Sequence, residues 1–240
     1  MSTVEKEVNW KSYAQKYDML LSYNPYYQQL YNEVLSYTNN WDTFPNDILL
    51  DIGAGTGNYS TQLALQHPQA NIIHIDNDKG MNLEAANKAN FLGLKNHIIT
   101  DKNIREVVFA HNSVKGIISI HALYTFPNPT EIIKRIYNWL VPNGKVVLVD
   151  AGRIVNVISW QIAIGYHLLK NYGLKKTLSI MEEGKEVSKQ NSVIRQMQKS
   201  GKFWMHSHKE FCSAIEDAGF IIENAHKTFR NVSDFVVARK

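Results

Sequence analysis

An α/β fold is predicted for this chain, with a mostly parallel sheet covered by helices on both faces. Residues 48–150 alternate short apolar runs with helix-prone stretches, which is the pattern of strands joined by crossover helices. The first run, residues 48–52, is largely apolar, as expected for a strand that is buried on both faces. Several of these runs carry an acidic residue near their end, and three closely spaced glycines follow the first. Together these features predict a crevice for a polar ligand at one edge of the sheet.

The glycines lie in the run ILLDIGAGTG, at residues 48–57. Gly53, Gly55 and Gly57 let the backbone bend sharply and let a ligand approach the main chain closely. The helix that follows offers unpaired N–H groups and a partial positive charge at its N-terminus. The turn is therefore predicted to hold a small polar molecule, and a glycine turn that binds nothing is the alternative.

The glycine spacing differs from that of two common nucleotide-binding motifs. It is G-x-G-x-G rather than the dinucleotide pattern G-x-G-x-x-G, and the phosphate-loop pattern G-x-x-x-x-G-K-(S/T) is absent. Asp51 precedes the turn, and its carboxylate would repel a phosphate but suit an ammonium group, directly or through water. Here the chain resembles the class I S-adenosylmethionine-dependent methyltransferases of the small-molecule branch, whose first motif is (D/E)-x-G-x-G-x-G.

This resemblance covers about residues 48–150 and implies a Rossmann-like sheet of seven strands. Most of them would be parallel, with an antiparallel C-terminal strand and helices on both faces. The resemblance also implies S-adenosylmethionine as the cofactor and S-adenosylhomocysteine as its product. The residues around the turn that would bind this cofactor are Asp51, Gly53, Ala54, Gly55 and Gly57.

Further cofactor-binding residues follow the next two apolar runs. Residues 71–76 end in Asp76, which is suited to accept hydrogen bonds from ribose hydroxyls, and Asn77 comes next. The resemblance implies that Met81 packs on the adenine, although an ordinary core methionine is the alternative. It also implies that Asp101, at the end of residues 96–101, accepts the adenine amino group. The backbone N–H of Lys102 would then donate to a ring nitrogen.

An aromatic motif opens the chain at residues 10–18, WKSYAQKYD. It resembles the W-x-x-Y-A-x-x-Y-D opening of many small-molecule methyltransferases, in which the tyrosines close over cofactor and substrate. Tyr13 and Tyr17 lie four residues apart and hence on one face of a helix. Core packing alone is the alternative for both.

Catalytic candidates lie at the end of the fourth strand candidate, residues 114–124, where a doubly wound sheet places its ligand crevice. His121 and Tyr124 would come near the transferred methyl group, together with Tyr17. The ordinary pKa of histidine suits a general base, so His121 is predicted either to take up a proton or to contact the cofactor. A structural histidine is the alternative.

Substrate contacts are predicted from Tyr124 and from three residues outside the motifs. Arg153 could hold an acidic substrate group or make an ion pair, and Trp204 and His206 could line the acceptor site. His206 and His208, two residues apart and without a third ligand nearby, are weak evidence for a metal, so no metal is predicted.

The 240 residues are predicted to form a single domain, 1–240. Residues 1–44 would form an N-terminal helical cap. Residues 151–205 break the strand–helix alternation and would form a helical insertion, either as a lid over the substrate site or as helices packed on the sheet. The apolar run 154–169 is too short and too polar to span a bilayer.

The composition of the chain constrains where the protein is located and what it interacts with. A single cysteine, Cys212, excludes an internal disulfide, and the first residues lack an apolar signal segment, so a cytoplasmic location is predicted. Residues 170–210 hold most of the net positive charge, which is interpreted as a solvated helical face rather than a binding patch. A monomer or homodimer is expected.

The function predicted from these patterns is transfer of a methyl group from S-adenosylmethionine to a nitrogen or oxygen of a small, partly hydrophobic molecule. Methyltransferases that act on the amino groups of nucleic-acid bases carry (D/N)-P-P-(Y/F/W) after the fourth strand, whereas this chain has IHAL at residues 120–123, so no nucleic-acid partner is expected. Two alternatives remain open. One is a regulatory or scaffolding module that binds the cofactor without methyl transfer, and the other is an aminopropyl transferase.

Overall fold

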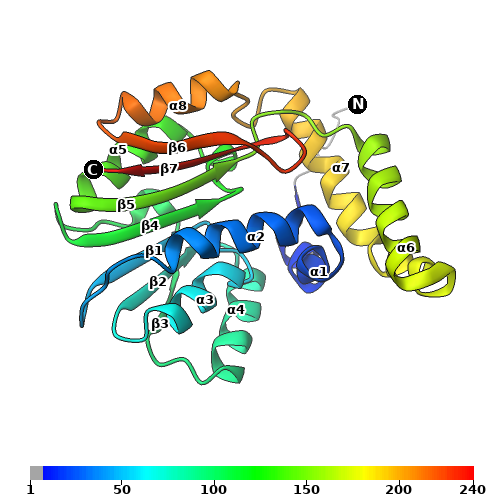
Figure 1. Cartoon of the computed structure of the whole chain (residues 1–240), viewed down its shortest axis with the longest axis horizontal. Helices are drawn as coiled ribbons and strands as arrows, with labels where there is room; N and C mark the ends of the chain where they lie inside the picture. The colour runs from blue at the N-terminus through cyan, green and yellow to red at the C-terminus, as the bar shows by residue number, and fades with distance from the viewer. Residues whose placement is uncertain (1–7) are drawn as a thin grey trace, which may run out of the picture.

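Seven strands form one sheet at the centre of the protein, in a computed structural model that describes residues 8–240 (Figure 1). They are β1 (Ile48–Ile52), β2 (Asn71–Asp76), β3 (His97–Asp101), β4 (Val114–Ile120), β5 (Leu140–Asp150), β6 (Ile221–Thr228) and β7 (Ser233–Arg239). Their order across the sheet is β3-β2-β1-β4-β5-β7-β6. The pairs among β1 to β5 are parallel, and β7 is antiparallel to both β5 and β6. The predicted mostly parallel sheet with an antiparallel C-terminal strand is confirmed.

Two hydrophobic cores flank this sheet because successive side chains of a strand point to opposite faces. In β5, Val146 and Leu148 pack in the core under α5 (Pro129–Trp139) and α8 (His208–Glu216). Val147 and Val149 pack in the other core, under α2 (Pro25–Thr38) and α3 (Asn58–Gln66). The helix α4 (Lys79–Phe91) lies beside α3, next to β2 and β3. Both faces of the sheet are therefore covered, as a parallel sheet requires.

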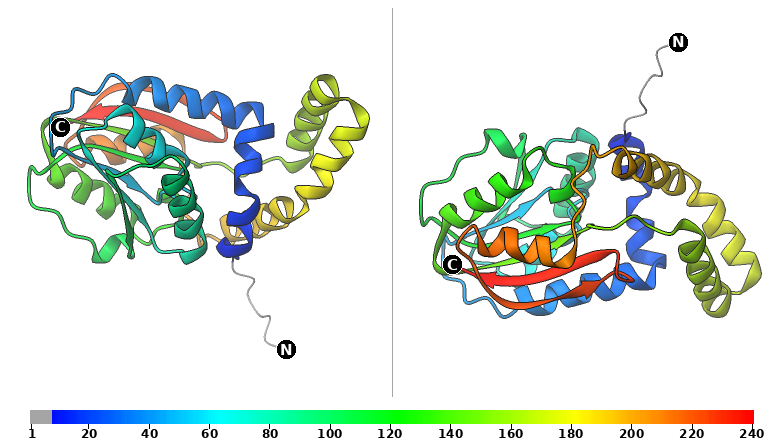
Figure 2. Two further views of the ribbon diagram at one scale, coloured as in Figure 1. Left: turned by 90° about the horizontal axis from the view of Figure 1, so that it is seen from below. Right: turned by 90° about the horizontal axis from the view of Figure 1, so that it is seen from above.

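Three more helices lie at the carboxyl ends of the parallel strands. They are α1 (Trp10–Tyr23), α6 (Val157–Glu183) and α7 (Lys185–Lys199). Figures 1 and 2 show α6 and α7 as an arm that stands out from the body of the molecule, with α1 between the arm and the sheet. Gly173 interrupts α6 with a left-handed φ of 70°, so the helix is kinked at that residue. The segments predicted to be helical thus meet at the edge of the sheet where the ligand crevice is expected.

The first residues of β5 and of α5 each show a local feature. In β5, Leu140 pairs with Val114 ahead of residues 142–144. Asn128 precedes α5 with a left-handed backbone, and its side chain makes no capping hydrogen bond. Its carbonyl oxygen accepts the N–H of Glu131 instead, at 3.0 Å.

Within residues 8–240, no helix combines the length and the apolar character that crossing a bilayer requires.

Candidate functional site

The glycine turn, residues 53–57, joins the end of β1 to α3. Gly53, Gly55 and Gly57 all have left-handed φ angles, of 69°, 55° and 78°, which side-chain-bearing residues rarely adopt. A Cβ on Gly53 would lie 2.3 Å from the Cβ of Ala122, and one on Gly57 would lie 2.8 Å from the Cβ of Ala85. A Cβ on Gly55 would instead meet only the sulfur of Met81, at 3.9 Å. Two of the glycines therefore allow close packing within the protein, and Gly55 borders open space.

Asp51 lies behind this turn with a carboxyl group that lacks a full set of partners. The side chain is buried, and its Oδ2 atom has no hydrogen-bond partner. Burial, together with the nearby charge of Asp76, raises the pKa of Asp51 to about 8. A buried acceptor without a donor is costly, so a cationic or N–H-bearing ligand group beside Oδ2 would stabilise the carboxylate. This is the chemistry that an amino-acid ammonium group supplies.

Asp76 ties the glycine turn to the end of β2. Its Oδ2 accepts the N–H of Gly55 and its Oδ1 accepts the N–H of Asp78, both at 2.9 Å. Burial raises the pKa of Asp76, and these backbone hydrogen bonds act against that rise. Each carboxylate oxygen has a second lone pair, so the group keeps the capacity to accept further hydrogen bonds from hydroxyls. Asn77 follows directly, before α4.

Met81, Asp101 and Lys102 lie along the same edge of the sheet. Met81 is buried in a small cluster with Tyr13 and Ala14 of α1. Asp101 ends β3 in an exposed position, where one oxygen accepts the side-chain amide of Asn82 at 3.3 Å. The backbone N–H of Lys102 donates to the carbonyl of Thr100 at 3.0 Å, so the donor expected to reach a ligand ring is engaged within the chain.

The helix α1 is fastened to the glycine turn by Asp18. Its Oδ1 accepts hydrogen bonds from the hydroxyl of Thr56 at 2.8 Å and from the amide of Asn58 at 3.0 Å, and its Oδ2 pairs with Lys88 at 2.7 Å. The fixed position of α1 places Tyr13 and Tyr17 beside the turn. Asp18 is part of the aromatic motif at residues 10–18, but no role was predicted for it from the sequence.

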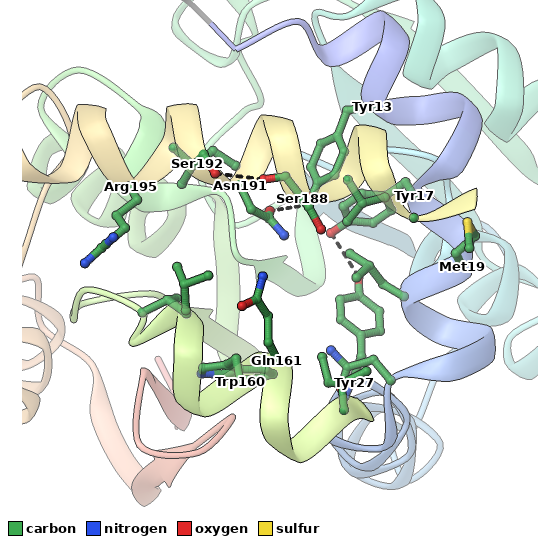
Figure 3. Close-up of a pocket in the computed structure, with 18 of the residues that line it drawn as sticks. Tyr13, Tyr17, Met19, Tyr27, Trp160, Gln161, Ser188, Asn191, Ser192 and Arg195 are labelled. Carbon is green, nitrogen blue, oxygen red and sulfur yellow. Dashed lines mark hydrogen bonds between the residues drawn. The ribbon is translucent and has the colours of Figure 1, made fainter. Parts of the chain in front are cut away.

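A cavity of about 380 Å³ lies on the other side of α1, between α1, α6 and α7 (Figure 3). Its walls are mostly apolar and aromatic, with Trp160 from α6 and Phe229 from the turn between β6 and β7 among them. Tyr13 donates its hydroxyl to Asn191 at 2.8 Å, and Tyr27 donates to the hydroxyl of Tyr17 at 3.0 Å. Such a size and lining are typical of small-molecule sites. The candidates His121, Tyr124, Tyr13 and Tyr17 all line it.

His121 follows β4 in a left-handed backbone conformation, with φ of 54°. Its Nε2 lies 2.8 Å from the hydroxyl of Ser233, and its ring centre lies 4.9 Å from that of Phe229. Burial lowers the pKa of His121 to about 4. The expectation of an ordinary histidine pKa is therefore wrong, because no carboxylate contacts the ring to offset its burial. The imidazole is neutral at pH 7 and is a weak base.

Tyr124 is held in the cavity wall by the end of β5. Its backbone N–H donates to Oδ1 of Asp150 at 3.1 Å, and its ring meets that of Phe203 edge-on, with centres 5.1 Å apart. Burial, and then the charges of Asp150 and Tyr17, raise the pKa of its hydroxyl well above the usual range. Tyr124 can thus donate a hydrogen bond but does not serve as a phenolate.

Arg153, Trp204 and His206, which were predicted as substrate contacts, do not line this cavity. Both guanidinium NH groups of Arg153 pair with Asp234, at 2.5 and 3.0 Å, so the ion-pair alternative is the one the structure favours. Trp204 faces a shallow depression between α5 and α8. A local sequence pattern does not reveal these contacts, because their partners are distant in the chain.

His206 is enclosed by two carboxylates. Its Nε2 lies 3.3 Å from Asp150 and its Nδ1 lies 3.4 Å from Asp234. Burial alone would lower the pKa of His206, but the hydrogen bonds and charges of the two carboxylates outweigh it and raise the pKa to about 9. His206 is thus a buried cation that joins β5 to β7. Among the described residues, no group of three or more His, Cys, Asp or Glu side chains is arranged to hold a metal ion.

Arg195 and Gln198 of α7 line the cavity and were not predicted. They belong to the basic segment that the sequence suggested is a solvated face. Their spacing could have identified them from the sequence. Asn191, Arg195 and Gln198 recur at steps of four and three, and hence lie on one face of a helix.

Comparisons with known proteins agree with this geometry. Residues 50–148 match the family model of a methyltransferase domain. A carboxy-S-adenosyl-L-methionine synthase from Nautilia profundicola is 30% identical over 132 residues, which are 53% of this chain and 53% of that protein. A tRNA (guanine-N(7)-)-methyltransferase from Christiangramia forsetii is 34% identical over 117 residues, 46% of this chain and 50% of that protein. The chain thus spans about half the length of these curated relatives.

A solved structure of a SAM-dependent methyltransferase from Aquifex aeolicus superposes with a TM-score of 0.62 at 18% identity, covering 95% of this chain and 97% of that one. At this identity the likeness concerns the fold. The matched segment, 50–148, begins within β1, ends within β5 and holds Asp51, Asp76 and Asp101. Residues 50–148 thus match a methyltransferase domain, and over the rest of the chain the likeness to the S-adenosylmethionine-dependent methyltransferase is one of fold.

Proposed function

We propose that this protein transfers a methyl group from S-adenosylmethionine to a nitrogen or oxygen atom of a small, partly hydrophobic molecule. One observation carries the proposal: the Oδ2 atom of Asp51, which lacks a partner among the described residues, and the open approach to Gly55 lie on one side of α1, and the mostly apolar and aromatic cavity lies on the other. A polar half-site thus adjoins an apolar one, as a reaction between a charged cofactor and an apolar acceptor requires.

The polar half-site fits the cofactor by the chemistry of its donors and acceptors. Asp51 offers a buried acceptor to the ammonium group, and Gly55 leaves room for the chain of the amino acid. We assign the ribose to Asp76 and the adenine to Met81 and Asp101. When bound, S-adenosylmethionine supplies an activated methyl group on a positively charged sulfur.

The apolar half-site supports catalysis by orientation and exclusion of water rather than by a strong base. His121 has a pKa of about 4, and burial raises the pKa values of Tyr13, Tyr17 and Tyr124. None of these four groups therefore has a pKa near neutrality, where general bases work best. We assign them to positioning the acceptor atom in line with the methyl group, in a site from which water is excluded.

The arm formed by α6 and α7 is assigned the role of a lid. Its inner face supplies Trp160, Ile164 and Leu168 to the cavity, and the kink at Gly173 gives the arm a point of bending. In this assignment the chain is one domain, with residues 1–44 as a cap and 151–205 as the lid.

Two measurements test the proposal. Calorimetry of the purified protein should show binding of S-adenosylmethionine and of S-adenosylhomocysteine. Incubation of the protein with methyl-tritiated cofactor and a cell extract should then place the label in a small-molecule fraction that is extractable into organic solvent. Absence of cofactor binding, or label found only in tRNA, would contradict the proposal.

The same incubation distinguishes methyl transfer from the alternative functions. Tight cofactor binding without any transferred label would indicate a binding module, and preference for decarboxylated S-adenosylmethionine would indicate an aminopropyl transferase. The relative that is named as a synthase of carboxy-S-adenosyl-L-methionine favours a second candidate, chemistry on the cofactor itself. Mass spectrometry of the nucleosides released from the protein would detect such a product.

A further inference from the structure

Arg195 is the only Asp, Glu, Lys or Arg among the described residues that line the cavity. No hydrogen bond or ion pair to its guanidinium group is present in residues 8–240, and its Nε is buried without an acceptor. Figure 3 shows the side chain leaving α7 on the side that faces α6. Because no Asp or Glu of residues 8–240 lines the cavity, the described walls do not neutralise the positive charge there.

Gln198 lies one turn further along α7, beside Arg195, and is also incompletely bonded. It is 5% exposed, and its Oε1 has no partner. The oxygen and nitrogen of such an amide are assigned from their surroundings, so with the amide reversed Gln198 presents a donor at this point. Arg195 and Gln198 together then form a donor pair on one wall of a mostly apolar space.

We infer that the acceptor molecule carries a carboxylate, which Arg195 and Gln198 bind at the wall formed by α7. This inference rests on the proposed function, since it assigns a chemical class to the substrate of the same cavity. A planar guanidinium binds a carboxylate through two parallel hydrogen bonds, and such charge-assisted bonds are stronger where water is excluded. The aromatic walls would hold the apolar body of the molecule.

The test uses 2-naphthoate and its neutral analogue 2-naphthamide, measured by calorimetry with S-adenosylhomocysteine at saturation. Naphthoate should bind at least about tenfold more tightly than naphthamide. In Arg195→Gln the two affinities should become equal. In Lys199→Gln, which removes one exposed positive charge from the same helix, the preference should be retained.

Equal affinities in the unaltered protein, no binding of naphthoate, or a preference that survives in Arg195→Gln would overturn the inference. The affinity for S-adenosylhomocysteine is measured first in every variant. Its absence from the unaltered protein would contradict the proposed function, whereas its presence without a carboxylate preference contradicts only this inference.

A second, independent observation concerns the outer face of α6. Ile158, Ile162, Tyr166 and Leu169 recur at steps of four, four and three, so they form one stripe, and each is at least half exposed. Beyond the kink, Leu174 and Leu178 are also exposed apolar side chains. We call these six residues the outer stripe. No comparable run of exposed large apolar side chains occurs elsewhere in residues 8–240.

Charge indicates what this stripe contacts. Residues 154–181 contain no Asp or Glu, and their lysines, Lys170, Lys175 and Lys176, are all exposed. An apolar helix face with flanking lysines suits an anionic bilayer surface, where the apolar side chains enter the headgroup boundary. A second copy of the chain would instead bring lysines against lysines. No helix in the described residues crosses a bilayer, so the arm would lie on the surface.

We propose that the outer stripe docks on the surface of an anionic phospholipid bilayer. The opposite face of α6 lines the cavity, so docking would place the cavity one helix diameter from the lipid.

Flotation with vesicles of phosphatidylcholine, with or without phosphatidylglycerol, tests this proposal. The protein should float with the anionic vesicles and much less with the neutral ones. The triple variant Ile158→Ser, Ile162→Ser, Tyr166→Ser should lose more than about tenfold in binding. Lys175→Gln and Lys176→Gln should each cost about fivefold. The control variant Leu65→Ser, Leu83→Ser, Phe91→Ser removes exposed apolar side chains elsewhere and should leave binding unchanged.

An equal loss in the control variant would contradict a specific docking face. Absence of binding to anionic vesicles would do the same, as would a dimer in solution that the triple variant dissociates.

Discussion

The two sides of α1 differ in how their residues are brought together. On the side of the glycine turn, the functional residues lie at the ends of β1, β2 and β3, within about fifty residues of sequence. On the cavity side, they come from α1, β4, α6, α7 and the turn between β6 and β7. The first side is polar and its groups are bound by local hydrogen bonds, and the second is apolar and held by side-chain packing. A local motif can therefore specify the cofactor half, whereas the acceptor half depends on the tertiary structure.

The largest expected effect is on the glycine side. Gly55→Val would place a branched side chain at a left-handed residue and into the open approach to the turn, so cofactor affinity should fall by more than about a hundredfold. Calorimetry measures this cofactor affinity in the variant and in the unaltered protein. Gly93→Val is the matched control, because Gly93 has a similar φ of 66° and open surroundings but lies away from the site. Equal losses in both variants would show that strain, rather than the site, is responsible.

The buried cation His206 should contribute to the pH dependence of stability above neutrality, alongside Asp51, whose raised pKa acts in the same direction up to about pH 8. Its pKa is about 9 in the folded protein against an ordinary value of 6.5, so its contribution is complete below about pH 6.5 and is lost as the pH rises through 9. The free energy of unfolding of the unaltered protein should therefore decline over this interval, by about 3 kcal/mol from this group. Denaturant titrations at a series of pH values measure this free energy in the unaltered protein and in His206→Gln. The free energy of unfolding should decline less steeply with pH in the variant.

On the cavity side, His121→Ala should lower the rate of methyl transfer about tenfold, since it removes a positioning group rather than a base. Cofactor affinity should stay within about threefold, because the ring faces Ser233 and Phe229. The rate of methyl transfer, measured between pH 5.5 and 8.5, is the sharper test of this role. A step near pH 6.5 that disappears in the variant would restore the general-base role.

The smallest effect is expected where the two sides meet. Asp18→Ala removes the contacts that join α1 to Thr56, Asn58 and Lys88, and these contacts are partly exposed. Cofactor affinity should fall two- to fivefold. Hydrogen exchange should become faster in α1 and stay unchanged in α5, which lies on the far face of the sheet. Unchanged exchange in α1 would indicate that aromatic packing alone holds the helix.

The contrast between the two sides also explains what could be predicted from sequence. The sheet and the glycine turn were predicted because strand periodicity and glycine spacing are local signals. The neutral state of His121 was not, because it depends on the absence of any carboxylate around a buried ring. His206 and Arg153 were assigned to the substrate because their partner, Asp234, approaches them only through the pairing of β7 with β5. Arg195 was missed because its neighbours across the cavity come from α1 and α6.

The carboxyl group of Asp51 has one more consequence, for calorimetry. With a pKa of about 8 it carries a proton most of the time at pH 7 in the free protein. A cationic ligand beside Oδ2 would favour the ionised form and release that proton into solution. The heat of association should then differ between phosphate and Tris, in proportion to the ionisation enthalpies of the two buffers, and Asp51→Asn should remove the difference.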